Sequence, residues 1–71
     1  MENKVEELRK NLGMNQEDFA KAISVSRQTV SSIENGKYNP SLDLAFVISD
    51  FFDKKIEDIF IHERSNQNEK K

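Results

Sequence analysis

Apolar residues recur three or four positions apart in successive segments of the chain, which is the spacing of amphipathic helices. The first segment carries one apolar stripe at i, i+3 and i+7: Val5, Leu8 and Leu12. Asn3 followed by Glu6 has the form of a capping box, so we expect a helix to begin there. Gly13 ends it.

The next two apolar segments lie so close together that only a tight turn can join them. Asn15 caps the first of them. Its apolar positions at i, i+1 and i+4 are Phe19, Ala20 and Ile23. Ser24 and Val25 form the turn, and Ser26 caps the following helix. In that helix the apolar residues Val30 and Ile33 point inward. Gly36 ends the helix in the left-handed conformation.

A longer helix is predicted after the Asn39-Pro40 turn. Ser41 caps it, it runs to about Phe52, and it is apolar on nearly every side, so we expect it to be central. A short final helix is predicted from three apolar residues: Ile56, Ile59 and Phe60. Residues 62–71 are polar and lack periodicity, which predicts a disordered tail after a single domain over residues 1–61.

The outward side of the segment over residues 26–35 has an unusual composition. It carries the following polar residues: Arg27, Gln28, Ser31, Ser32 and Asn35. A merely solvated helix normally carries Glu and Lys, whereas Arg and the amides offer the paired donors and acceptors that base edges and phosphates require. The face therefore predicts contact with nucleic acid.

The formal net charge of −2 argues mildly against such contact, because most nucleic-acid binders are basic. The distribution of charge matters more than its sum. Between Ser24 and Ser41 only Arg27, Glu34 and Lys37 are charged, while most acidic residues lie elsewhere. A neutral to weakly positive face against an acidic back would orient the protein on a duplex.

The 71 residues include no cysteine, which excludes a disulfide framework and a thiolate zinc site. The longest apolar run, Leu44–Ile48, is far below the roughly 20 residues needed to cross a bilayer, and the N-terminus lacks a signal-peptide pattern. We expect a soluble cytoplasmic protein with no membrane partner. The single histidine, His62, has no second ligand type nearby, so we expect no metal, no cofactor, no catalytic residue and no enzyme activity.

A family resemblance rests on residues 15–36, NQEDFAKAISVSRQTVSSIENG. This stretch resembles the Cro/CI-type, or XRE-family, helix-turn-helix, and with Lys37–Leu42 and Ile56–Phe60 it is similar to short stand-alone bacterial repressors over residues 4–61. The resemblance implies an all-α, compact five-helix lambda-repressor-like domain whose second and third helices form the helix-turn-helix. It also allows a small two-stranded sheet that pairs Phe60–Glu63 with Met1–Lys4.

The resemblance implies a sequence-specific transcriptional regulator, a homodimeric repressor that reads a pseudo-palindromic operator on double-stranded DNA through the major groove. Positions that meet base edges in the family are Arg27, Gln28 and Ser32. Thr29 and Ser31 lie at the margins of this set, and Thr29 faces either a thymine methyl group or a phosphate. Positions that match or border phosphate contacts are Gln16, Ser26, Asn35, Lys37, Tyr38 and Ser41. The alternative for both sets is an ordinary solvated surface. Arg9 and Glu34 match an ion pair that ties the first helix to the third, the alternative being two unrelated surface charges.

A dimer interface is expected at Ile56 and Ile59, an i, i+3 apolar pair on a short helix, flanked by Asn39 and Pro40. The alternative is that one subunit buries the pair in its own core. No small-molecule effector is expected.

Two residues depart from the family pattern. Ser24 stands where Gly is common, so a non-glycine residue must adopt positive φ at a cost of about 1 kcal/mol. Lys55 replaces the small capping residue before the last helix. The rival function is an antitoxin or controller-type module that binds another protein and contacts DNA secondarily, for which the spare segment Ser65–Lys71 is short and polar.

Overall fold

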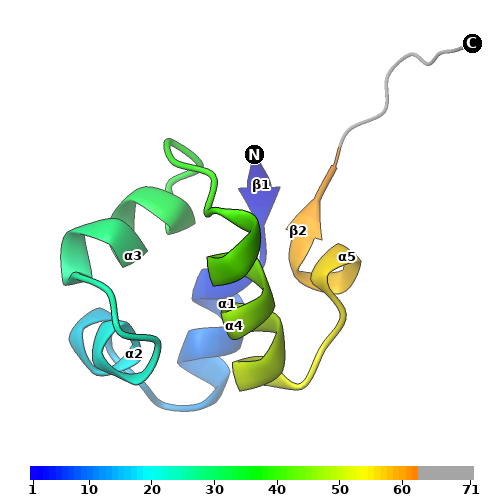
Figure 1. Ribbon diagram of the computed structural model, residues 1–71. Helices are drawn as coiled ribbons and strands as arrows, with labels where there is room; N and C mark the ends of the chain where they lie inside the picture. The colour runs from blue at the N-terminus through cyan, green and yellow to red at the C-terminus, as the bar shows by residue number, and fades with distance from the viewer. Residues whose placement is uncertain (63–71) are drawn as a thin grey trace, which may run out of the picture.

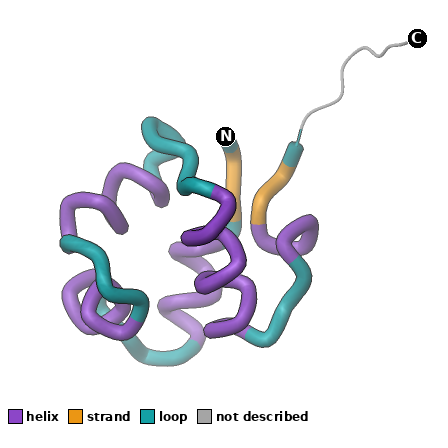
Figure 2. The backbone as a smooth tube through the Cα atoms, in the orientation of Figure 1, coloured by secondary structure: helices purple, strands orange, loops and turns teal. Residues whose placement is uncertain are grey.

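The computed structural model describes residues 1–62. Within these residues, five helices and a pair of short strands follow one another. Figures 1 and 2 show their arrangement. Their bounds are β1 (Glu2–Asn3), α1 (Val5–Asn11), α2 (Gln16–Ala22), α3 (Arg27–Glu34), α4 (Leu42–Phe52), α5 (Ile56–Ile59) and β2 (Phe60–Ile61). The predicted all-α class is confirmed, and the small terminal two-stranded sheet that the resemblance allowed is present. The predicted disordered tail falls outside the described residues except for His62.

Three helices begin at the capping residues that the sequence predicts. The side chains of Asn15, Ser26 and Ser41 each accept a hydrogen bond from the backbone N–H three residues further on, at 2.7, 3.1 and 3.2 Å. These bonds satisfy amide donors that the first turn of a helix leaves without partners. Gly13 and Gly36 take the left-handed conformation, with φ of 74° and 77°, after α1 and α3.

The predicted capping box at the start of α1 is wrong. Asn3 lies in β1, and α1 begins after Lys4, whose side chain makes no capping bond. The side-chain oxygen of Asn3 accepts a hydrogen bond from the Val5 backbone N–H at 3.1 Å instead. Asn3 stays extended because it pairs with Phe60 across the sheet, and Lys4 N–H donates to the Ile59 carbonyl at 2.8 Å.

The sheet joins the two ends of the described chain. β1 runs antiparallel to β2, with Glu2 opposite Ile61 and Asn3 opposite Phe60. In the described residues it is shorter than the pairing expected from the resemblance. By this pairing the N-terminal segment lies beside β2 and next to the chain that follows α3 (Figure 1).

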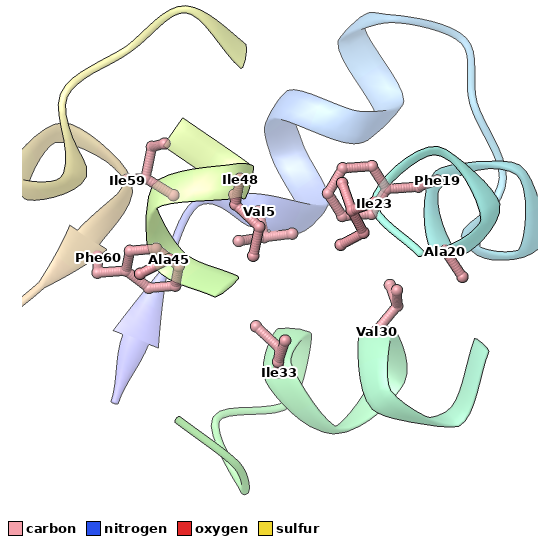
Figure 3. Packing of buried hydrophobic residues seen from close by; sticks show 10 residues of the cluster. All are labelled: Val5, Phe19, Ala20, Ile23, Val30, Ile33, Ala45, Ile48, Ile59 and Phe60. Carbon is pink, nitrogen blue, oxygen red and sulfur yellow. The ribbon is translucent and has the colours of Figure 1, made fainter. Parts of the chain in front are cut away.

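The core lies between α1, α2, α3, α4 and the α5–β2 segment, each of which contributes to it (Figure 3). Its buried apolar residues are Val5, Phe19, Ala20, Ile23, Val30, Ile33, Ala45, Ile48, Ile59 and Phe60. Phe19 also packs against Phe51 and Phe52, with ring centroids 5.4 and 5.2 Å away. The core thus holds the two helices of the predicted helix-turn-helix against a central α4, as the pattern predicted.

Leu12 does not complete the buried stripe of α1. It is 57% exposed, because α1 ends at Asn11 and Leu12 already belongs to the turn before Gly13. Met14 packs against the core after that turn. Among residues 1–62, no helix has both the length and the apolar character that a bilayer crossing requires.

Candidate nucleic-acid interface

The turn between α2 and α3 has a strained residue at its centre. Ser24 adopts φ of 62°, as expected for a position at which Gly is common in the family. The Val25 N–H donates to the Ala20 carbonyl at 2.9 Å. Ala20 is buried, so the two helices approach closely at the turn. The turn therefore packs the start of α3 against the end of α2.

α3 divides into a buried and an exposed side. Val30 and Ile33 are 0% and 1% exposed and pack into the core. Arg27, Gln28 and Asn35 are exposed, and Thr29, Ser31 and Ser32 are half-buried. The opening turn of the helix therefore presents a guanidinium and an amide to solvent.

A shallow recess of about 280 Å³ lies along one side of α3 and gathers several of the predicted contact residues. It is lined by Ser26, Gln28, Thr29, Ser32 and Tyr38. Tyr38 reaches this side because the chain after α3 folds back, with the Lys37 and Tyr38 N–H groups donating to the Ser32 carbonyl at 3.0 and 3.2 Å. Residues predicted for bases and residues predicted for phosphates thus share one concave surface.

Ser26 and Thr29 form hydrogen bonds with each other. The Ser26 hydroxyl accepts the Thr29 backbone N–H at 3.1 Å and lies 2.9 Å from the Thr29 hydroxyl. Ser26 therefore acts first as a helix cap. Four of the other phosphate candidates, Asn35, Lys37, Tyr38 and Ser41, are exposed and lie on the chain between α3 and α4.

A buried ion pair joins α1 to the last residue of α3. The Arg9 guanidinium donates to both carboxylate oxygens of Glu34, at 2.7 and 3.1 Å, and to the Met14 carbonyl at 2.8 Å. The side chains of Arg9 and Glu34 are only 7% and 3% exposed. The hydrogen bond to the Glu34 carboxylate raises the pKa of Arg9, so the guanidinium stays charged. Glu34 is compensated and does not present its charge to a ligand.

Gln16 belongs to the same buried network, which the sequence did not indicate. Its amide Nε2 donates to Glu34 Oε1 at 3.0 Å and so connects the start of α2 to the end of α3. Because an amide nitrogen carries two N–H groups, one donor remains for the predicted phosphate contact. The only available signal was a polar amide side chain at the first position of α2.

The predicted dimer surface needs one correction. Ile59 is 0% exposed and lies in the core, so it cannot contact a second subunit, and the alternative interpretation holds for it. α5 is a single turn between α4 and the sheet, which directs Ile59 inward and leaves Ile56 half-buried. Asn39, Pro40 and Ile56 line one apolar groove of about 380 Å³.

Leu42 also lines this groove, and Phe46 follows it on α4; the sequence did not indicate that either residue is exposed. Leu42 and Phe46 are 69% and 52% exposed, one helical turn apart on α4. Their exposure was not predicted because the helix is apolar on nearly every side. Within residues 1–62, no three His, Asp or Glu side chains are grouped in a way that could hold a metal ion.

Comparison with known proteins agrees with this geometry. The sequence profile of the helix-turn-helix family matches residues 5–59. An uncharacterized HTH-type transcriptional regulator of Methanocaldococcus jannaschii is 57% identical over 63 residues, which cover 89% of this chain and 96% of the relative. One of Archaeoglobus fulgidus is 45% identical over 71 residues, covering 100% of both chains.

A bacterial relative is similar over nearly the same length. The uncharacterized HTH-type transcriptional regulator YgzD of Bacillus subtilis is 48% identical over 66 residues, which cover 93% of this chain and 100% of the relative. The profile match spans most of the chain, and α2, the Ser24 turn and α3 have the corresponding geometry. The chain therefore belongs to the XRE-type helix-turn-helix family.

Proposed function

We propose that this protein is a sequence-specific DNA-binding transcriptional regulator that inserts α3 into the major groove. The observation that carries the proposal is the exposed opening turn of α3, where Arg27 and Gln28 project from a helix anchored by Val30 and Ile33. Arg can donate two hydrogen bonds to guanine, and Gln can pair with adenine through two bonds. The relatives named as transcriptional regulators support the same class of function.

Phosphate contacts position α3 in the groove. They come from Gln16 and from the chain between α3 and α4, which flank the recognition helix. Only Arg27 and Lys37 are cationic between residues 24 and 41, so neutral side chains and backbone N–H groups supply most of the donors. Affinity therefore depends on a fitted surface more than on bulk charge attraction.

The protein acts as a homodimer and represses transcription by occupying a promoter. The second copy covers the apolar groove at Pro40 and Ile56 together with Leu42 and Phe46, which replace Ile59 in the interface. This surface directly follows the chain that bears Lys37 and Tyr38, so a twofold axis there would bring two copies of α3 onto the same side of a duplex. Each α3 reads one half-site, and the half-sites lie about 34–36 Å apart.

Selection of duplexes from a random pool, followed by footprinting of the enriched site, tests the proposal. We expect a pseudo-palindrome with half-site centres about 10 base pairs apart. The matched control is the Arg27→Ala, Gln28→Ala double variant, which keeps the fold but removes both groups. A parent protein that enriches no sequence over this control would contradict the function.

A further inference from the structure

The N-terminal strand lies against the C-terminal end of α3, about thirty residues away in the chain. The side-chain nitrogen of Asn3 donates to the Ile33 carbonyl at 2.8 Å, over a separation of 30 residues. The Met1 backbone nitrogen donates to the Gly36 carbonyl at 3.2 Å. Figure 1 shows β1 between β2 and the chain that follows α3.

The Asn3 amide meets a chemical need at this helix end. The last carbonyl groups of a helix have no partner within the helix, and they carry a partial negative charge. The Ile33 carbonyl accepts the Gly36 N–H at 3.0 Å, and the Asn3 amide supplies a second donor for its remaining lone pair. Asn3 is half-buried, so solvent competes only weakly for this bond.

Asn3 is itself held on both sides. Its side-chain oxygen accepts the Val5 N–H at 3.1 Å, and its backbone pairs with Phe60 in the sheet. Lys4 N–H donates to the Ile59 carbonyl directly after it. The Asn3 amide is therefore a fixed donor, attached to the start of α1 and to the α5–β2 segment.

We propose that Asn3 is a positioning residue for DNA readout, which sets the height and tilt of α3 by anchoring its C-terminal end. The buried Arg9–Glu34 pair fixes α3 from the body of α1, and Asn3 fixes it from the sheet, beyond the last turn. Two anchors on separate elements prevent α3 from pivoting about either one. This inference rests on the proposed function, because it names what α3 is positioned for.

The decisive variant is Asn3→Asp. It keeps the size of the side chain and the oxygen that accepts the Val5 N–H, but it places a carboxylate oxygen against the Ile33 carbonyl. A negative charge beside the start of α1 is favourable for that helix, which offsets part of any loss of overall stability. Asn3→Ala removes the side-chain bonds to Val5, Ile33 and Met1. Asn11→Asp, at an exposed residue at the opposite end of α1, is the control for the change in net charge.

Two measurements separate anchoring from a general loss of stability. Hydrogen exchange followed by NMR measures the exchange rates of the Gly36 and Lys37 amides, which donate to the Ile33 and Ser32 carbonyls. Both should exchange faster in Asn3→Asp than in Asn11→Asp, while amides in α2 stay unchanged. Affinity for the selected operator should fall about three- to tenfold beyond the control, with unspecific duplex affinity equal to the control's.

The outcomes distinguish the two proposals. Unchanged exchange at Gly36 and Lys37 in both Asn3 variants overturns the anchor, and faster exchange with operator affinity equal to that of Asn11→Asp overturns its role in readout. If Asn3→Ala proves too unstable to fold, Asn3→Asp alone decides both points. A parent protein that selects no operator refutes the regulator function and the readout role with it, while the exchange result still decides whether Asn3 holds α3.

Discussion

Arg9 on α1 and Glu34 at the end of α3 form a two-point ion pair with almost no exposure to solvent, with the guanidinium Nε 2.7 Å from the carboxylate. Removing one partner would leave the other charged and buried, whereas removing both would leave a cavity without a bare charge. The pair therefore acts as a fixed link between the body of the domain and the helix proposed to read DNA.

A double-mutant cycle should show this coupling. Glu34→Ala should lower the free energy of unfolding by about 3–5 kcal/mol, and Arg9→Ala combined with Glu34→Ala should cost less than the sum of the single changes. Urea denaturation followed by circular dichroism measures both. Glu6→Ala is the control, because it breaks an exposed pair with Lys10 and should change stability little. Additive single and double effects would show that Arg9 and Glu34 do not interact.

Replacing the exposed residues of the opening turn of α3 should weaken operator binding without unfolding the protein. Arg27→Ala or Gln28→Ala should cost about 1–3 kcal/mol at the operator and relax the preference at one or two positions in each half-site. Arg27→Lys keeps the charge but loses the planar guanidinium group. Compared with Arg27→Ala, it should therefore restore unspecific binding but not the base preference. Fluorescence anisotropy against the operator and a scrambled duplex gives both values. Wild-type affinity in both Ala variants would contradict the assignment of α3.

The two left-handed glycines should differ in their tolerance of a side chain. Gly13 and Gly36 share a positive φ, but a Cβ at Gly13 would meet open space while one at Gly36 would lie 3.3 Å from the Met1 carbonyl oxygen. Gly13→Ala should cost about 1 kcal/mol for the backbone conformation alone. Gly36→Ala should cost more, because Met1, directly before β1, must also shift away from the end of α3. Equal losses in urea denaturation would show that β1 yields freely there.

The dimer should depend on the exposed side of α4. Leu42→Glu or Phe46→Glu should give a folded monomer that binds the full operator far more weakly, because linkage of two half-site contacts is lost. Leu12→Glu introduces the same charge at an exposed leucine on the turn after α1 and should leave assembly unchanged. Sedimentation velocity reports the assembly state. If the parent sediments as a monomer at micromolar concentration and binds operators as single subunits, the dimer proposal is wrong.

Ile59→Asp, which the sequence alone would suggest for the same purpose, is not a test of assembly. Ile59 is fully buried, so a carboxylate there would unfold the domain before it could inform on an interface.

The sequence by itself determined the features that depend on neighbours a few residues apart. Caps at Asn15, Ser26 and Ser41, and the left-handed Gly36, follow from hydrogen bonds and backbone sterics within one turn. The positive φ of Ser24 was expected from the family pattern and not from its residue type. The inward side of α3 follows from helical periodicity. Residue types on the remaining side were enough to propose a DNA-reading helix.

Only the tertiary structure decided which partner each side chain contacts where several partners were possible. Asn3 could cap α1 or join a strand, and pairing with Phe60 selected the strand and brought its amide to Ile33. Gln16 is linked to Glu34 only because α1, α2 and α3 meet there, and Ile59 is buried because the short α5 closes over the core. These outcomes join residues distant in sequence, and local propensity and periodicity contain no information about which distant surfaces meet.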